Sequence, residues 1–296
     1  MAISKSVIPA AGFGTRMLPA AKAVPKEMLP VLDRPTIQYV VEEATDAGAG
    51  DVMLITSRDK RAIEDHFDRH AELEARLASS GKSELLSSIQ KLMEQAKVHS
   101  VRQREQHGLG DAVLQARKFI GNEPFLCLLG DAIFSADLGM PLPAKQLVDA
   151  QAQFGGSIIG LEEVPAEKVS RYGIVGGTTI ADGVMKLDAL VEKPSVETAP
   201  SRFAIAARYV LAPTVFAALE RTPPGKGGEI QLTDALKLML DADETIHGVV
   251  LKARRHDIGN PADWLRTNLI FAQRDAVLWK QIAPLIRSLL DGREAK

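Results

Sequence analysis

The chain has 296 residues, of which 46% are hydrophobic and 25% are charged, a composition typical of a globular protein with a large core. Its formal net charge of −2 gives no global basic field, so we expect no nucleic-acid partner and no attraction to a membrane surface. The single cysteine, Cys127, excludes an intrachain disulfide and a cysteine-cluster metal site, and it favours a cytoplasmic protein. Glycine, proline and arginine interrupt the N-terminal region too often for a signal peptide, and no apolar run is long enough to span a membrane.

Short apolar runs of β type alternate with helical stretches along the chain. Strands are expected at 6–9, 51–56, 97–102, 125–129, 156–162, 174–175, 184–191, 203–210 and 246–251. Helices are expected at 35–47, 58–67, 109–119 and 230–240, with a helical hairpin at 71–95 and one or two amphipathic helices at 264–290. This alternation predicts an α/β fold: a doubly wound, mainly parallel (Rossmann-like) mixed sheet with helices on both faces, a helical insertion and a C-terminal helical segment.

The loop after the first expected strand carries two glycines and two cations. On an open α/β sheet, ligands bind outside the C-terminal ends of the strands, where this loop is placed. Gly12 and Gly14 allow the backbone to approach a phosphate, while Arg16 and Lys26 supply positive charge. Met17 occupies the third position of the dinucleotide fingerprint, so a Rossmann cofactor site is not supported. An ordinary strand–helix turn with a surface arginine is the alternative, but the four residues together favour a polyphosphate site.

An aspartate follows the apolar strand expected at 125–129. Gly130 and Asp131 come directly after this run, which puts one carboxylate at the ligand edge of the sheet. Magnesium usually takes one or two protein carboxylates together with phosphate oxygens and water. Asp131 is therefore a candidate magnesium ligand, with a helix N-cap as its alternative role.

Five motifs occur in order along the chain. They are Gly12-x-Gly14-Thr15-Arg16, Pro25-Lys26-Glu27-Met28-Leu29-Pro30, Gly130-Asp131, Val191-Glu192-Lys193-Pro194 and Gly228-Glu229-Ile230-Gln231-Leu232-Thr233-Asp234. By these motifs the chain resembles the nucleotidyltransferases that make sugar nucleotides, and within them the bacterial UTP–glucose-1-phosphate uridylyltransferases (UDP-glucose pyrophosphorylases). The resemblance runs essentially from end to end. It implies transfer of the uridylyl group from UTP to glucose 1-phosphate, with Mg2+ as cofactor and pyrophosphate as the second product.

The resemblance also implies roles for residues on the nucleotide side. The nucleotide-binding residues would be Ala11, Gly12, Gly14, Gln103 and Gly108. The amide of Gln103 has both hydrogen-bond donors and an acceptor, so it can bond to the polar edge of uracil. Without the resemblance, a surface glutamine would be the preferred interpretation.

On the phosphate side, the resemblance implies that Arg16 and Lys26 face the triphosphate. It implies that Asp131 holds Mg2+, with Asp257 as a second metal ligand.

In the second half of the chain the resemblance implies a sugar site of Gly173, Glu192, Lys193 and Glu229. Glu192 would accept hydrogen bonds from two hydroxyls, and Lys193 would pair with the sugar phosphate. Neighbouring strand residues point to opposite faces, so both reach one ligand only if Pro194 ends the strand and bends the backbone. The alternatives are a solvated Glu192–Lys193 pair and, for Glu229, a first-turn acid favoured by the helix dipole.

The implied reaction is in-line attack of glucose 1-phosphate on the α-phosphorus of UTP, with Arg16, Lys26 and Lys193 as catalytic cations and no covalent enzyme intermediate. We expect a catalytic domain at 1–260, with the insertion at about 70–96 and the sugar-binding part at about 156–255. Residues 261–296 would form C-terminal helices, whose apolar stripe either packs within the chain or contacts a second copy. A second copy is favoured, because related enzymes are dimers or tetramers. Other nucleotide or amino-sugar specificities remain open, as does a nucleotide-sensing protein without turnover.

Overall fold

The computed structural model describes residues 2–292. The first half of the chain forms a parallel sheet in the order β5 (Lys97–Arg102), β4 (Asp51–Thr56), β1 (Lys5–Pro9) and β6 (Phe125–Leu128). Each strand agrees within one residue with the range predicted from its apolar run. Because the four strands are parallel, the loops that follow β1 and β6 meet at the same edge of the sheet.

Five further strands continue this sheet beyond β6, in the order β11 (Phe203–Leu211), β8 (Ser157–Glu163), β12 (Ile246–Val250), β10 (Val184–Glu192) and β9 (Gly173–Ala181). Strands β8 and β12 are parallel, whereas the other pairings, including β6 with β11, are antiparallel. The prediction of a mainly parallel sheet is therefore correct for the first half and wrong for the second. For β9 and β10 the reason is the length of the connection: residues 182–183 alone join them, and so short a turn permits only antiparallel pairing.

Helices cover both faces of the sheet, as predicted. Ile8 of β1 lies in one hydrophobic core and its neighbour Val7 lies in the other, because successive strand residues point to opposite faces. The helices of the Ile8 core include α1 (Thr36–Asp46) and α7 (Pro143–Phe154). Those of the Val7 core include α5 (Leu109–Leu114), α8 (Val215–Arg221) and α9 (Leu232–Asp241). The helix predicted at 109–119 divides into α5 and α6 (Arg117–Ile120).

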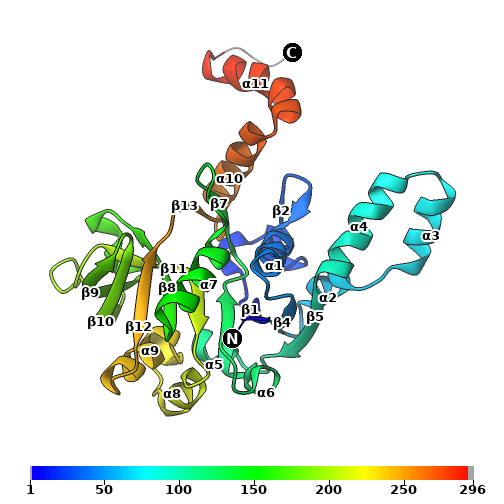
Figure 1. The fold of residues 1–296 in the computed structure, drawn as a ribbon. Helices are drawn as coiled ribbons and strands as arrows, with labels where there is room; N and C mark the ends of the chain where they lie inside the picture. Colours follow the sequence, from blue (N-terminus) through cyan, green and yellow to red (C-terminus); the bar gives the residue numbers. More distant parts are fainter. Residues whose placement is uncertain (1, 293–296) are drawn as a thin grey trace.

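Two helical pairs extend from this body (Figure 1). The hairpin predicted at 71–95 consists of α3 (Ala71–Ser79) and α4 (Ser83–Gln95), which follow α2 (Arg61–Phe67). The C-terminal pair consists of α10 (Pro261–Arg274) and α11 (Ala276–Leu290). The last residues of the predicted C-terminal segment, 293–296, lie outside the described residues. Within residues 2–292, no helix is both long and apolar enough to cross a membrane.

A two-stranded ribbon beside the main sheet was not expected from the sequence. Strand β7 (Ala132–Ala136) pairs antiparallel with β13 (Ala253–Asp257), although more than a hundred residues separate them along the chain. A smaller hairpin joins β2 (Pro30–Val31) to β3 (Arg34–Pro35). Because β7 begins directly after Asp131, the ribbon brings the end of β13 to the edge where the ligand loops meet.

Candidate active site

A pocket of about 450 Å³ opens at the C-terminal edge of the parallel strands, and we call it the glycine-loop pocket. Loops that follow β1, β5 and β6 supply most of its wall. The predicted site residues that line it are Ala11, Gly12, Gly14, Lys26, Gln103, Gly108, Asp131 and Glu229. The fold thus gathers both the nucleotide-side residues and the first metal candidate into one cavity.

The two glycines of the loop after β1 differ in their surroundings. Gly14 has a left-handed backbone (φ 66°), and a side chain there would lie 3.3 Å from the aliphatic stem of Lys26. At Gly12, apart from its two chain neighbours, no atom of the described residues lies within 4 Å of the place where a side chain would begin. Gly14 therefore lets the loop pass beneath Lys26, whereas Gly12 leaves the backbone open to a ligand.

Gln103 is buried in the wall of this pocket. Its Nε2 donates to the backbone oxygen of Gly108 at 3.1 Å and to Asp111 Oδ2 at 2.6 Å. These two acceptors fix the orientation of the amide, since the flipped amide would set oxygen against oxygen. Among the described residues no donor bonds to Oε1, which leaves that atom to accept a hydrogen bond from a bound base.

Lys26 and Asp131 form an ion pair in the same pocket, with Nζ 2.5 Å from Oδ2. Burial by itself would lower the pKa of Lys26 and raise that of Asp131. The attraction between the two groups outweighs burial. The pKa of Lys26 therefore lies above its ordinary value. The pKa of Asp131 lies below its own ordinary value, and Arg16 lowers it further. The site therefore holds an ammonium and an ionised carboxylate at neutral pH.

The ribbon of β7 and β13 brings a second aspartate, Asp257, close to the backbone of Asp131. Asp257 lies opposite Ala132 in the ribbon, and the Ile258 N–H donates to the backbone oxygen of Asp131 at 3.4 Å. The Gly259 N–H donates to Asp257 Oδ1 at 2.7 Å and so orients that carboxylate. Two such carboxylates suit Mg2+, which prefers hard oxygen ligands and adds phosphate oxygens and water. No group of three or more His, Cys, Asp or Glu side chains within residues 2–292 could hold a metal, so these two would need ligands from a substrate.

A second pocket, of about 370 Å³, lies at the end of β10, and we call it the Glu192 pocket; its lining is Glu192, Lys193, Gly227, Glu229, Gln231 and Asp234. Strand β10 ends at Glu192, and Lys193 has a left-handed backbone (φ 49°) just before Pro194. This bend puts Lys193 Nζ 3.2 Å from Glu192 Oε1. The condition expected from the sequence, that the backbone bends at Pro194, is therefore met.

The carboxylate of Glu192 is held from two sides. Thr233 Oγ1 donates to Glu192 Oε2 at 2.9 Å. Gly173 lies opposite Glu192 in the β9–β10 pair, and a side chain at Gly173 would come within 3.1 Å of Oε2. Gly173 therefore lies directly beside the Glu192 carboxylate, and its lack of a side chain leaves room there.

Glu229 lines both pockets and so marks their junction. Two backbone bonds hold the chain there: Ile230 N donates to His107 O at 2.7 Å, and Gly110 N donates to Ile230 O at 2.8 Å. A side chain on Gly108 (φ 101°) would lie 2.8 Å from Glu229 Cβ, so the approach requires glycine. The two pockets are therefore adjoining parts of one site.

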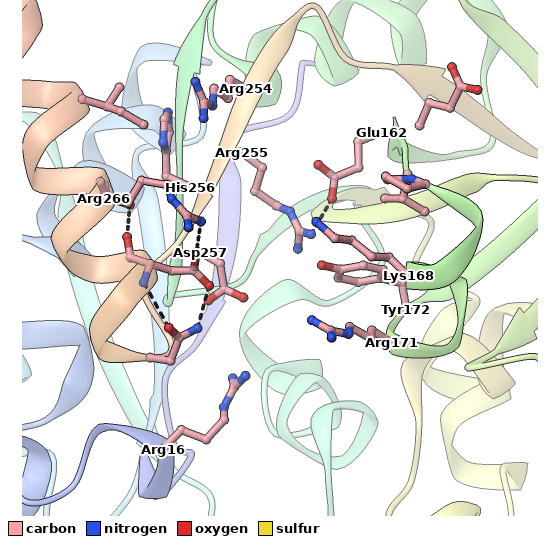
Figure 2. Close-up of a pocket in the computed structure, with 17 residues that line it drawn as sticks. Arg16, Glu162, Lys168, Arg171, Tyr172, Arg254, Arg255, His256, Asp257 and Arg266 are labelled. Atoms are coloured by element: carbon pink, nitrogen blue, oxygen red, sulfur yellow. Dashed lines mark hydrogen bonds and ion pairs between the residues drawn. The ribbon is translucent and has the colours of Figure 1, made fainter.

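Arg16 and Asp257 do not line the glycine-loop pocket but a third cavity of about 530 Å³, which we call the arginine cleft (Figure 2). The sequence did not predict this cavity. Arg16 packs against the β13–α10 connection, since a side chain on Gly259 would lie 2.7 Å from Arg16 Nη2. Arg16 nevertheless acts on Asp131, whose pKa it lowers, so the cleft and the glycine-loop pocket are neighbours.

Comparisons with known proteins identify the family of the chain. A family model described as Nucleotidyl transferase matches residues 5–274. The chain belongs to the nucleotidyl transferase family. It is 48% identical over 290 residues to UTP--glucose-1-phosphate uridylyltransferase 1 of Staphylococcus saprophyticus, covering 98% of this chain and 99% of that one.

Two solved structures extend the comparison. The UTP-bound UGPase from Acinetobacter baumannii has a TM-score of 0.89 and 37% identity, covering 97% of this chain and 99% of that one. A UDP-glucose pyrophosphorylase complexed with UDP-glucose has a TM-score of 0.83 and 38% identity, covering 92% and 99%. The resemblance that the five motifs indicated is confirmed.

Sequence reasoning missed a buried ion pair behind the Asp131 loop of this nucleotidyl transferase. The fully buried Arg208 donates to both carboxylate oxygens of Glu43 at 3.0 and 2.8 Å. It also donates to the backbone oxygens of Leu129 at 3.4 Å and Ala132 at 2.8 Å, on either side of Asp131. The available signal was a single arginine inside the apolar strand β11.

Proposed function

We propose that this nucleotidyl transferase transfers the uridylyl group of UTP to glucose 1-phosphate, giving UDP-glucose and pyrophosphate. The names of its relatives support UTP and glucose 1-phosphate as substrates. The single observation that carries the proposal is the junction at Glu229, where the glycine-loop pocket meets the Glu192 pocket. One pocket offers an acceptor for a base and a cation for phosphates, and the other offers a carboxylate beside a lysine.

On the nucleotide side, Gln103 Oε1 would accept from the N3–H of uracil, and Gly12 would allow the backbone to lie close to the base. Cytosine has no hydrogen at N3, so this acceptor favours uracil over cytosine. Thymine has the same N3–H, so this contact does not separate UTP from dTTP.

On the sugar side, Glu192 would accept hydrogen bonds from hydroxyls of glucose, and Lys193 would bind its phosphate. Lys26 and Arg16 would bind the triphosphate. Two polyanions repel each other, so cations on both sides lower the cost of bringing them together. Asp131 and Asp257 would hold Mg2+, which would neutralise charge on the phosphates.

We infer that the reaction needs no protein nucleophile. A phosphate oxygen of glucose 1-phosphate attacks the α-phosphorus of UTP in line, and the bond to the β-phosphate oxygen breaks as pyrophosphate leaves. Cys127 takes no part in this scheme, because it is buried in β6 and burial raises the pKa of its thiol to about 12.

The most direct experiment measures pyrophosphate release with glucose 1-phosphate and each of UTP, dTTP, GTP and ATP in turn, and with N-acetylglucosamine 1-phosphate in place of the glucose ester. UTP with glucose 1-phosphate is expected to give the highest kcat/KM. A higher value for another pair would replace the proposed substrates, and no release with any pair would favour a nucleotide sensor.

Variants test the two sides of the site separately. Lys193→Ala is expected to raise KM for glucose 1-phosphate roughly 10- to 100-fold, since a hydrogen bond to a charged group contributes about 1.5–3 kcal/mol. Asp131→Ala is expected to lower kcat with UTP and to weaken Mn2+ binding in a direct titration. Lys186→Ala, at an exposed lysine of the same strand as Glu192, is the control. Near-normal kinetics in Asp131→Ala would contradict the metal assignment.

A further inference from the structure

The arginine cleft carries more positive charge than its own carboxylates balance. Six cationic side chains line it, namely Arg16, Lys168, Arg171, Arg254, Arg255 and Arg266. Four acidic side chains line it, namely Glu162, Glu163, Asp257 and Asp263. This excess is local, since the whole chain has a formal net charge of −2.

Most of the carboxylates are already engaged. Glu162 pairs with Arg255, Asp263 pairs with Arg266 at 2.6 Å, and Glu163 pairs with Arg202 outside the cleft. Asp257 is the second metal candidate. Within residues 2–292, no carboxylate lies within ion-pair distance of Arg16, Lys168, Arg171 or Arg254.

The cations of the arginine cleft come from different segments of the chain, which form its opposite walls. Figure 2 shows Arg16 reaching into the cleft from below, Arg255 from the β13 side, and Lys168 and Arg171 from the short helical segment η4 (Ala166–Arg171). Arg255 is fixed in place, because it pairs with Glu162 and its guanidinium lies 4.8 Å from the ring centroid of Tyr172. Arg16 and η4 therefore face the same space from opposite sides.

The neighbouring histidine does not add to this charge. His256 is buried, and its ring nitrogen lies 2.7 Å from Ser135 Oγ. Burial, Arg254 and Arg274 lower the pKa of His256 to about 4, so it is neutral at pH 7. The charge that a ligand meets therefore comes from guanidinium and ammonium groups, which keep it at every physiological pH.

The cleft begins where the triphosphate site ends. Thr15 lines the glycine-loop pocket, and the next residue, Arg16, lines the cleft. Asp131 lines the pocket, and its ribbon neighbour Asp257 lines the cleft. The volume of about 530 Å³ falls in the range of small-ligand sites, about 300–1,000 Å³. An anion leaving the triphosphate site past Arg16 therefore enters the arginine cleft.

We propose that the arginine cleft is a binding site for inorganic pyrophosphate, formed by Arg16 on one wall and by Lys168 and Arg171 on the other. This inference rests on the proposed function, in which the bond between the α-phosphorus and the β-phosphate oxygen breaks and the electron pair leaves with pyrophosphate. Pyrophosphate carries negative charge on both of its phosphates. Cations on opposite walls of the cleft can each bind one phosphate. In the reverse reaction the same cations hold pyrophosphate for attack on UDP-glucose.

The test is a calorimetric titration of the enzyme with inorganic pyrophosphate in the presence of Mg2+. The K168Q/R171Q variant is expected to bind pyrophosphate at least tenfold more weakly than the wild type. In pyrophosphorolysis of UDP-glucose, its KM for pyrophosphate is expected to rise by a similar factor, while KM for UTP in the forward direction changes less than twofold. Both side chains are exposed and have no ion-pair partner within residues 2–292, so the fold is expected to persist.

Lys252→Gln is the matched control, since Lys252 is an exposed cation directly before β13 but does not line the cleft. Pyrophosphate affinity within twofold of the wild type in the double variant, or an equal loss in Lys252→Gln, would overturn the proposal. A loss of glucose 1-phosphate binding as large as that of pyrophosphate would also overturn it, because the cations would then serve the sugar phosphate. The titration needs no turnover, so a wild type that binds pyrophosphate in the cleft but makes no UDP-glucose would refute only the proposed function.

Discussion

At the scale of single residues, the candidate site depends on groups that line none of its pockets. Arg208 and Glu43 are both buried, and Arg208 bonds to the carbonyls on either side of Asp131. The importance of a buried ion pair for stability shows mainly when one partner is removed, because the other charge is then left buried without a counter-ion. The position of the metal candidate is thus tied to a pair on the far side of its loop.

Arg208→Met is expected to lower the free energy of unfolding by about 3–5 kcal/mol, because it leaves Glu43 buried without a counter-ion. Adding Glu43→Gln should recover part of this loss, since it removes the unpaired charge. Urea denaturation of both variants checks the prediction. A double variant no more stable than Arg208→Met would show that the stranded charge is not the cause.

Gly259→Ala tests whether Arg16 must lie against the β13–α10 connection. The added methyl would lie 2.7 Å from Arg16 Nη2, so the guanidinium must move. We expect kcat/KM for UTP to fall roughly tenfold, equivalent to about 1.4 kcal/mol. In an Arg16→Ala background the same change should have a smaller effect, whereas fully additive losses would assign the effect to Asp257 Oδ1, which the added methyl would approach to 2.9 Å.

His66 gives a pH dependence of stability with a defined sign. Burial lowers the pKa of His66, whose Nε2 lies 3.1 Å from Gln38 Oε1. Below about pH 6.5 the unfolded chain therefore binds a proton that the folded chain does not, and stability falls as the pH decreases. Between pH 7.5 and 5.5, urea denaturation should show a smaller loss of stability in His66→Gln than in the wild type. Parallel losses in both proteins would assign the slope to other groups.

At the scale of elements, sequence patterns predicted the helices and strands that local sequence determines. Strand β4 matches its predicted range because an apolar run between turn residues defines it. Helix α7 was missed although Pro143 at its start and Gly155 after its end are capping signals that could have found it. The β7–β13 ribbon could not be found in this way, because it depends on a long-range pairing of a segment that contains three consecutive charged or polar residues, Arg254–His256.

The same distinction applies to the site. Most site residues lie in contiguous motifs that a sequence comparison can find. The Arg208–Glu43 pair joins residues 165 positions apart, and the arginine cleft joins η4 to the loop after β1. These residues come together only once the sheet has formed, so the spacing of residues along the chain does not predict their contacts.

The α3–α4 hairpin is expected to be separable from catalysis, because it lines none of the three cavities. Gly81 in its turn has a left-handed backbone (φ 69°), and a β-branched residue there costs roughly 1–2 kcal/mol. Gly81→Val should therefore speed proteolysis within 71–95 and leave KM for UTP and for glucose 1-phosphate within twofold. Ser80→Ala in the same turn is the control. Altered kinetics in Gly81→Val alone would place the hairpin in the catalytic cycle.

At the scale of the whole molecule, α11 has no buried residue and extends away from the body (Figure 1). Its exposed apolar side chains include Val277 at 72%, Leu289 at 59% and Leu290 at 82%. An apolar helix face left in water is unfavourable, and it is typical of a protein–protein contact. We propose that a second copy of the chain covers it, in line with the oligomer expected from the sequence.

Leu285→Glu combined with Leu289→Glu is expected to shift the mass measured by light scattering after size-exclusion chromatography from an oligomer to the monomer of 32.0 kDa. Each substitution puts a charge into the contact, and desolvating an unpaired charge disfavours association. Lys280→Gln changes an exposed charge on the same helix and should leave the mass unchanged. The three cavities are lined by residues of one chain before α11, so the monomeric variant should keep its KM for UTP and for glucose 1-phosphate. A wild type that is already monomeric at micromolar concentration would leave the apolar face of α11 without this partner and refute the proposal.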